Sequence, residues 1–565
     1  MPKFSSFFRQ LTNALRYLAR GDLSGLANRL KWYGREYSHV KLRRRLANGN
    51  GIVWGILCTP HTLFIARTIA NRLAFHGIES EIMMGSVKSF NHDFYVVLCA
   101  QMFKRLPPPN KRVIFQLEQS VNSRWFTQEY IKTLTSSSGV LEYSLTNIDF
   151  LAQNGLKYPR VHYLPIGASL DQVIERNPKP KKYDFVFYGD CSSSERRRSF
   201  LEKLQEKYTV KICGNLFGNE LYDIIKESKA VINIHYYEGA LLEMPRICEC
   251  ISLGVPVLSE GTADQDDYPE LEGAVKFFDQ GSIESMMACA LSILNNSETV
   301  SKTLETAVSV SAARFNFMMD RFLVTIGVIP ANIILEHPIY VARKSDFFAL
   351  SLPETIERRR IIAQSLPDGC ELFDGIRHSR GWIGCGSSFN ALSRYAILND
   401  MDRLTVIEDD VELPGSFTAI LREVNDYLDA RKLSWDIFSG LMADVHSSAK
   451  IISVDQVAGR TYVTIDKMTS TVFNIYNESA LKLMSRWDPL NVDAVTNTID
   501  RYLERQDNLR VVVALPFIAG HKEDATSTLW GFENERYTPM IAEAQRKIEV
   551  LVREWRRANP QINYD

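Results

Sequence analysis

The sequence lacks an excess of charge of either sign. Its 565 residues carry 66 Lys and Arg against 67 Asp and Glu, a formal net charge of −1. A general nucleic-acid binder needs a basic excess over a whole domain to meet the phosphates. The charge balance therefore predicts that nucleic acid is not a partner.

Long apolar runs and a cysteine framework are missing as well. No run approaches the ~20 apolar residues that cross a bilayer, and the N-terminus lacks the apolar core and cleavage site of a signal peptide. The nine cysteines are scattered, and Cys248-x-Cys250 has neither the spacing nor the partner pair of a zinc site. This usage is typical of reduced thiols. We expect a soluble cytoplasmic protein with three to four cores by the ~150-residue prior.

Residues 1–48 carry an apolar stripe at a spacing of three to four, and the polar positions are mainly basic. The stripe contains Phe4, Phe7, Phe8, Leu11, Leu15 and Leu18. A basic amphipathic helix of this kind lies on an anionic membrane surface, packs on its own protein, or binds a partner protein. The pattern does not choose among the three.

From 49 to about 172, short continuous apolar strands alternate with helical stretches, as in Arg112–Leu117. This pattern predicts a parallel, doubly wound α/β sheet, with ligands at the carboxyl ends of the strands. Four polar residues follow one such strand directly and are candidates for an acceptor cleft, with Glu118 as the candidate catalytic carboxylate: Glu118, Gln119, Asn122 and Arg124. A plain polar loop is the alternative interpretation.

A second set of the same kind occupies 173 to about 330, after the linker Pro178–Lys182. Its strands include Phe185–Gly189 and Val210–Gly214, each ending in a glycine that lets backbone amides approach a phosphate. Two consecutive open α/β units form a cleft between them. This is the GT-B arrangement, a double Rossmann-like module.

The stretches Ile234–Gly239, Pro245–Glu249 and Ser252–Val257 resemble the donor-binding segment of GT-B glycosyltransferases, especially the spore-maturation and family 1/family 4 types. The resemblance implies a nucleotide-sugar donor held by this segment, which includes His235. It implies that Glu249 accepts the ribose hydroxyls and that Arg246 reaches the diphosphate. A carboxylate takes two hydroxyl donors, and a guanidinium neutralises phosphate oxygens.

No metal is implied for this module, because positive side chains and a helix dipole can stabilise the departing diphosphate. The chain departs from the pattern at Leu241, where many such enzymes carry a first glutamate. Glu238 and Glu243 lie on either side of it. The donor's orientation therefore stays open.

Nearer the C-terminus, the apolar run Leu404–Ile407 leads directly into Glu408, Asp409 and Asp410. Adjacent carboxylates repel each other unless a cation or protons lie among them. Hard oxygen ligands at a strand end suit Mg²⁺ or Mn²⁺. Such an ion takes one or two protein carboxylates and keeps other coordination positions for a diphosphate. We expect a metal site at these three residues; a solvated acidic turn is the alternative.

The region from about 345 to 530 resembles glycosyltransferase family 25, the lipopolysaccharide type. The resemblance rests on the order of a strand at Phe347–Leu352, an arginine pair at Arg358 and Arg359, a turn at Gly381–Ser388 and the acidic strand end. Trp435–Ile437 and Thr498–Leu503 also fall where that family has a strand and a helix start. It implies a GT-A-like module over 340–565, in which the arginine pair contributes to the nucleotide site.

The same resemblance suggests Asp500 as the catalytic base. Asp444 and Asp493 are the next candidates for this role. A lone acidic residue at a helix start is otherwise an N-cap. The family commonly has a histidine where this chain has Phe389, so its role is missing or moves to His378 or His521.

Together these patterns predict an N-terminal helical segment (1–48), a GT-B module with acceptor and donor sides (49–172 and 173–330) and a GT-A-like module (340–565). The predicted function is a bifunctional glycosyltransferase that builds a bacterial capsule, O-antigen or lipopolysaccharide at the cytoplasmic face of the membrane. Its expected partners are nucleotide-sugars, a glycan or lipid-linked glycan acceptor and an anionic membrane surface. The alternatives are one active transferase with a degenerate binding domain, or a non-catalytic scaffold.

Overall fold

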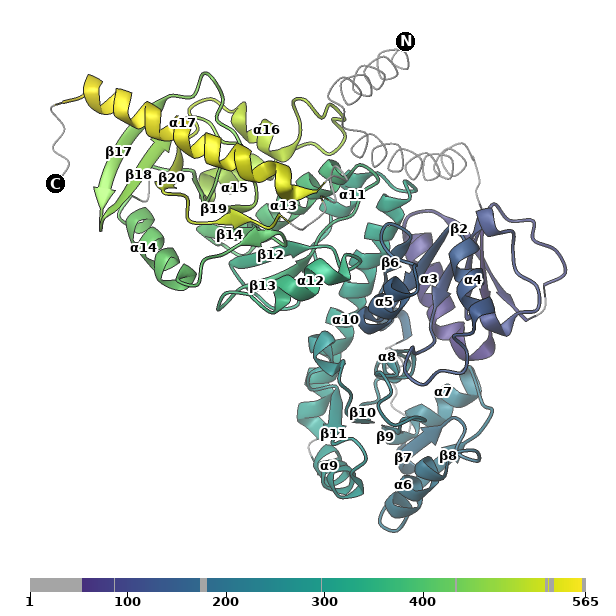
Figure 1. Cartoon of the computed structure of the whole chain (residues 1–565). Helices are drawn as coiled ribbons and strands as arrows, with labels where there is room; N and C mark the ends of the chain where they lie inside the picture. Colours follow the sequence, from purple (N-terminus) through teal and green to yellow (C-terminus); the bar gives the residue numbers. More distant parts are fainter. Residues whose placement is uncertain are drawn as a thin grey trace. The chain divides into compact units, whose positions relative to one another are not determined.

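The computed structural model describes residues 53–85, 87–172, 180–295, 297–431, 434–523, 527 and 533–560. By its contacts the described part of the chain divides into a first unit that ends at Phe322 and a second unit that begins at Leu323 (Figure 1). The predicted basic helix over 1–48 lies outside the described residues. In the described ranges no helix is both long and apolar enough to cross a membrane.

The first unit begins with a six-stranded parallel sheet in the order β2-β1-β3-β4-β5-β6. Its strands are β1 Val53–Cys58, β2 Glu79–Met84, β3 Phe94–Leu98, β4 Arg112–Gln116, β5 Gly139–Glu142 and β6 Val161–Tyr163. The helices are α3 Leu63–Phe75, α4 Gln128–Ser136 and α5 Leu145–Gln153. Strands β3, β4 and β5 are buried along their whole length, which explains their continuous apolar sequences.

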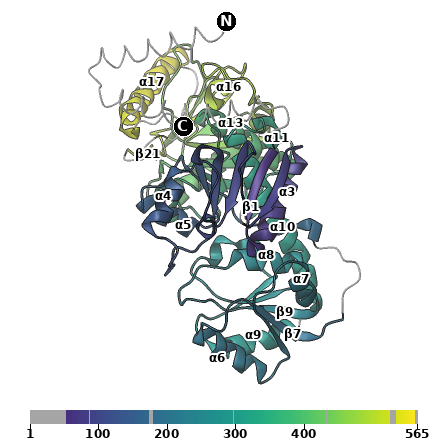
Figure 2. The ribbon, with the colours of Figure 1, turned by 90° about the vertical axis from the view of Figure 1, so that its right-hand side faces the viewer.

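A second parallel sheet follows in the order β11-β10-β9-β7-β8. Figure 2 labels two of its strands, β7 and β9, and the helices α6, α7 and α9. Its strands are β7 Tyr183–Tyr188, β8 Val210–Cys213, β9 Ser228–Asn233, β10 Val257–Glu260 and β11 Val275–Phe278. The helices are α6 Glu195–Gln205, α7 Asn219–Lys226, α8 Met244–Ser252, α9 Ile283–Asn295 and α10 Ser297–Thr325. The predicted pair of parallel α/β sheets is confirmed.

Both sheets reverse their strand order beside their first strand, because β1 lies between β2 and β3 and β7 lies between β8 and β9. Ligands of open α/β sheets bind in the crevice outside the carboxyl ends of the strands at such a point. Ion pairs connect a helix of the first sheet to a helix that follows the second sheet. Arg72 and His76 of α3 both contact Asp320 of α10, and Asp320 is 2% exposed.

The second unit contains an eight-stranded mixed sheet in the order β13-β12-β14-β19-β16-β20-β18-β17. Its strands are β12 Phe347–Ser351, β13 Glu371–Asp374, β14 Arg403–Glu408, β16 Ile437–Ser439, β17 Ile451–Val457, β18 Arg460–Ile465, β19 Phe473–Asn477 and β20 Val511–Leu515, and a short ribbon pairs β15 Val411–Glu412 with β21 Gly520–His521. The helices are α11 Ala331–Leu335, α12 Ile356–Ala363, α13 Gly381–Leu398, α14 Phe417–Asp429, α15 Glu478–Met484, α16 Ile499–Glu504 and α17 Tyr537–Ala558.

The predicted turn at Gly381–Ser388 is wrong, because these residues form the first turns of α13. The glycines are there for packing. A Cβ on Gly384 would meet the Ile376 carbonyl oxygen at 2.5 Å, and one on Gly386 would meet the Trp487 ring at 2.4 Å. The strand before Glu408 and the helix start near Thr498 are as predicted, at β14 and α16.

All nine cysteines are free thiols. Cys248 and Cys250 are completely buried in α8, so these two pack in the core as the sequence indicated.

Candidate functional site

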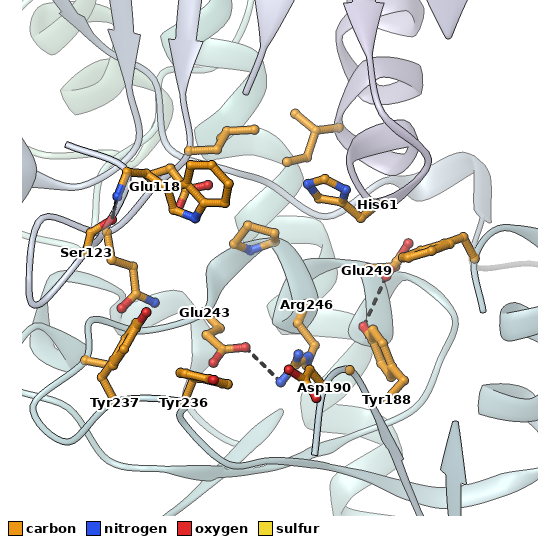
Figure 3. A pocket seen from close by; sticks show the side chains of 18 of the residues that line it. His61, Glu118, Ser123, Tyr188, Asp190, Tyr236, Tyr237, Glu243, Arg246 and Glu249 are labelled. Carbon is orange, nitrogen blue, oxygen red and sulfur yellow. Dashed lines mark hydrogen bonds and ion pairs between the residues drawn. The ribbon is translucent and has the colours of Figure 1, made fainter. Parts of the chain in front are cut away.

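The first unit contains a cavity of about 630 Å³ between its two sheets. Its lining includes the loops that follow β1, β4, β7, β8 and β9 together with residues of α8, so the cavity lies at the carboxyl ends of both sheets. His61 and Glu118 face Arg246, Tyr236 and Tyr237 across it (Figure 3). The predicted residues Glu118, Gly189, Gly214, Arg246 and Glu249 all line this one cavity.

A cationic subsite lies at the end of β7. The Arg246 guanidinium pairs with Glu243 at 2.7 Å and donates to the Asn233 side chain at 2.5 Å. Arg197, which is 5% exposed, reaches the same Glu243 at 3.2 Å. Although burial raises it, these two guanidiniums hold the pKa of Glu243 well below its ordinary value. Two guanidiniums therefore converge on one carboxylate, and Asp190 and Glu249 line the same side of the cavity.

Gly189 makes this subsite sterically feasible. Its φ is +128°, and a Cβ there would lie 3.1 Å from Nη2 of Arg246. Glycine is required here for two reasons. It adopts a backbone conformation that other residues rarely adopt, and it has no Cβ that would crowd the guanidinium. The Nε of Arg246 is buried and has no hydrogen-bond partner among the described residues. A buried donor of this kind fits an anion that enters the cavity.

Two tyrosines hold Glu249 on the same side. Tyr222 donates to its Oε1 at 3.0 Å. Tyr188 donates to its Oε2 at 3.1 Å (Figure 3). Burial raises the pKa of Glu249, and the two phenols work against that shift. Each oxygen keeps a further lone pair, so the carboxylate can still accept from a pair of ligand hydroxyls.

Glu118 lies on the opposite side, in the loop after β4. Its Oε1 accepts from Gln101 at 2.6 Å, and burial raises its pKa. Its backbone is fixed by Gln116, which both donates to its carbonyl oxygen and accepts from its amide, and by Asn147. Those two side chains in turn donate to the buried carboxylate of Glu142. The carboxylate at residue 118 is therefore rigidly placed.

The remaining residues predicted for the first unit either line this cavity or lie outside it. Gln119 and Arg124 line the cavity, and Gly214 opens onto it, since a Cβ there would meet no described atom within 4 Å. Asn122 and His235 are not part of the lining. The donor-contact role predicted for His235 is thus corrected: it is completely buried, with Nδ1 3.6 Å from Glu243 and Nε2 3.1 Å from the Glu260 carbonyl oxygen.

Sequence reasoning did not find Arg197, Tyr188, Tyr222 or His61. Arg197 and its neighbours appear in the sequence only as a basic helix, and tyrosines within a strand or an apolar helix face, such as Tyr188 and Tyr222, look like core residues. No local signal indicates that both tyrosines point at Glu249. Glu243, noted beside the Leu241 departure, is the glutamate that the structure places against Arg246.

In the second unit, an arginine side chain contacts the carboxylates that follow β14. Arg358 pairs with Asp409 and, at 2.9 Å, with Asp410. Asp409 also accepts from Ser351 at 2.8 Å, Asp410 from Asn534 at 3.1 Å, and Glu408 from Thr471 at 2.6 Å. Although burial raises it, His521 and Arg358 hold the pKa of Asp410 well below its ordinary value, while burial and Asp410 raise that of Glu408 to about 7.

These contacts do not fit the predicted magnesium or manganese site. Arg358 lies between Asp409 and Asp410, where the bridging cation would lie, and the three carboxylates turn toward different partners. Among the residues that the structure describes, no group of three or more His, Cys, Asp or Glu is arranged to hold a metal ion. The predicted nucleotide role of the arginine pair changes accordingly, because Arg358 binds Asp409 and Asp410 and Arg359 binds Asp374 at 2.7 Å.

Asp500 lies in the first turn of α16 and lines a separate cavity of about 510 Å³. Its Oδ1 accepts from the Arg501 amide at 2.8 Å. The reserve candidates Asp444 and Asp493 do not line this cavity. Of the two histidines, His521 lies 3.5 Å from Asp410, and His378 accepts from the Arg380 amide at 2.9 Å.

Comparison with known proteins finds no matching family model. The uncharacterised protein L140 of Acanthamoeba polyphaga mimivirus is 25% identical over 223 residues, which are 37% of this chain and 69% of the relative. Protein L137 of the same virus is 26% identical over 232 residues, which are 38% of this chain and 30% of the relative.

Three solved structures show a partial likeness to this chain, each at 10% identity. Sucrose-phosphate synthase from Thermosynechococcus elongatus covers 48% of this chain and 97% of its own, with a TM-score of 0.35. An alpha-glucosyltransferase in complex with UDP covers 46% and 96%, at 0.34, and Anabaena HepE in complex with UDP covers 48% and 98%, at 0.33.

Proposed function

We propose that the first unit is a glycosyltransferase that takes its sugar from a nucleotide-sugar bound in the cavity between its two sheets. The observation that carries the proposal is the cationic subsite at Gly189 and Arg246 beside the tyrosine-held Glu249. A diphosphate needs fixed positive charge at the end of a strand, and a ribose needs a hydroxyl acceptor a short distance away. Both are present on one side of one cavity.

Arg246 and Arg197 are assigned to the diphosphate. As the bond between the anomeric carbon and the phosphate oxygen breaks, negative charge grows on that oxygen. Positive groups fixed in advance stabilise this charge with little reorganisation. The unpartnered Nε of Arg246 supplies a donor for the phosphate oxygens.

Glu118 is assigned as the general base. It lies across the cavity from Arg246, and its burial raises its pKa toward the range in which a carboxylate takes a proton efficiently. In the transfer, the acceptor hydroxyl gives its proton to Glu118 and its oxygen bonds to the anomeric carbon. The nucleoside diphosphate leaves on the Arg246 side, so atoms and charges balance.

The test is titration calorimetry of the full chain with UDP, the nucleotide present in two of the solved structures above. Arg246→Ala is expected to weaken UDP binding by about 2 kcal/mol, the range for a charged hydrogen bond. Glu118→Gln is expected to leave UDP binding intact and to lower transfer by ~10²-fold or more. The exposed Lys203→Ala serves as a charge-matched control. If no nucleoside diphosphate binds, or if Arg246→Ala leaves its affinity unchanged, the assignment fails.

Further proposals rest on the sequence: a second transferase over 340–565, a bacterial surface glycan as the product, and docking of residues 1–48 on anionic membrane. Donor hydrolysis that survives Arg246→Ala would support the second transferase. Salt-sensitive flotation with anionic liposomes, lost when the chain starts at Asn48, would support the membrane role. A scaffold, by contrast, would show no nucleotide-dependent thermal shift.

A further inference from the structure

The second cavity lies wholly within the second unit, where residues of α13 and α16 contribute to its lining. Figure 1 labels these two helices. Its volume of about 510 Å³ falls in the range of small-molecule sites. One indole, two carboxylates, a thiol and a hydroxyl are among its lining groups: Trp382, Asp500, Glu504, Cys385 and Thr471.

Glu504 shows that the lining is not simply a solvated acidic face. The residue is 7% exposed, and its Oε2 pairs with Arg501 at 2.7 Å. Its Oε1 is buried, and within the described part of the chain no donor reaches it. A buried carboxylate oxygen without a donor is costly, so a native ligand that supplies one is favoured.

The charge around the cavity opposes phosphate. Asp500 and Glu504 face a single guanidinium, Arg501, which Glu504 already neutralises. Thr471 adds a link to a third carboxylate, because its hydroxyl donates to Glu408.

We propose that this cavity binds an unphosphorylated sugar. Sugar hydroxyls donate to Asp500 and to the free oxygen of Glu504, while the apolar face of the ring packs on Trp382. Aromatic side chains offer a large apolar surface to such a face, and carboxylates are pure acceptors for adjacent hydroxyls. The inference does not depend on the function proposed for the first unit.

Saturation-transfer NMR and calorimetry on the full chain test it, with glucose, galactose, maltose and lactose as neutral probes and with UDP, alone and with MnCl₂, as the phosphate probe. At least one neutral probe is expected to bind. Glu504→Gln and Asp500→Asn are each expected to weaken that binding about tenfold. The control Asp507→Asn, an exposed carboxylate just past α16, is expected to leave it unchanged.

Two results would overturn the proposal. One is that none of the four sugars binds, or that one binds equally well to all three variants. The other is that UDP binding, with or without Mn²⁺, is lost in Asp500→Asn and Glu504→Gln, which would make the cavity a nucleotide site. Because Asp500 is only partly buried and pairs only with a backbone amide among the contacts described, Asp500→Asn remains informative if Glu504→Gln does not fold.

Discussion

The side chain of Gln119 forms a paired hydrogen bond with the backbone of Leu241. Its Nε2 donates to the Leu241 carbonyl oxygen at 2.9 Å, and its Oε1 accepts from the Leu241 amide at 3.1 Å. Gln119 follows β4 of the first sheet, and Leu241 lies two residues before Glu243 in the second. The pair therefore joins the loop of the candidate base to the loop of the cationic subsite.

Gln119→Ala is expected to lose both hydrogen bonds and to weaken UDP binding several-fold, because the loop before Glu243 is no longer held against the first sheet. Two neutral hydrogen bonds contribute about 1 kcal/mol each to stability. Thermal unfolding and calorimetry measure the two effects. The exposed Gln205→Ala is the control. Equal UDP affinity in both variants would show that the pair has no part in the binding site.

Gly189→Ala is expected to reduce UDP affinity about tenfold by moving Arg246, since the new methyl group would lie 3.1 Å from Nη2. Gly218→Ala is the matched control. Its φ is also positive, +63°, but no described atom lies within 4 Å of its Cβ position. Both variants lose about 1 to 3 kcal/mol of stability to backbone strain. If the two variants bind UDP equally well, strain rather than displacement of Arg246 explains the effect.

Most of the first unit could be predicted from the sequence because its strands and the residues at their ends are recognisable from short local patterns. Continuous apolar strands identified the parallel sheets, and the glycines and polar residues at their ends identified the cavity. Arg246 and Glu249 could be found because both lie on α8 beside the matched segment. Tyr188 could not, because its partner Glu249 lies 61 residues away and only the packing of β7 on α8 joins them.

The metal prediction failed for a similar reason. Three adjacent carboxylates show that positive charge is needed, but not which cation supplies it. Arg358, 51 residues upstream of Asp409, was assigned to a nucleotide because no local pattern indicates that α12 points it at the acidic strand end. In the same way, the glycines of α13 look like a turn in the sequence. Their packing role becomes visible only in the structure, where the Trp487 ring lies against Gly386.

Arg358→Met is expected to destabilise the second unit by about 3 kcal/mol, because it leaves Asp409 and Asp410 buried without their cation. Thermal unfolding with EDTA and with MnCl₂ distinguishes the two readings of this site. If Arg358 is the resident cation, wild type melts at the same temperature in both buffers. Arg359→Met, which breaks only the pair with Asp374, is the control. A rise in wild-type melting temperature with Mn²⁺, absent in Asp410→Asn, would restore the metal site.

Glu142 should make stability depend on pH. It is completely buried, and burial raises its pKa from 4.5 to about 8 against the opposing hydrogen bonds from Ser144, Asn147 and Gln116. Between these two values the native state binds more protons at this site than the unfolded state does. The free energy of unfolding therefore falls as the pH rises through this range.

Glu142→Gln removes that titration while keeping a side chain of the same shape. Urea unfolding of wild type and variant from pH 5 to about 8.5, a range set by the shift of this group, is expected to give curves that converge at low pH and separate at high pH, with the variant more stable there. The exposed Glu129→Gln should follow wild type throughout. If Glu142→Gln instead loses the same stability as wild type with rising pH, the carboxylate is already ionised at pH 5, and the network around Glu118 is built on a charge.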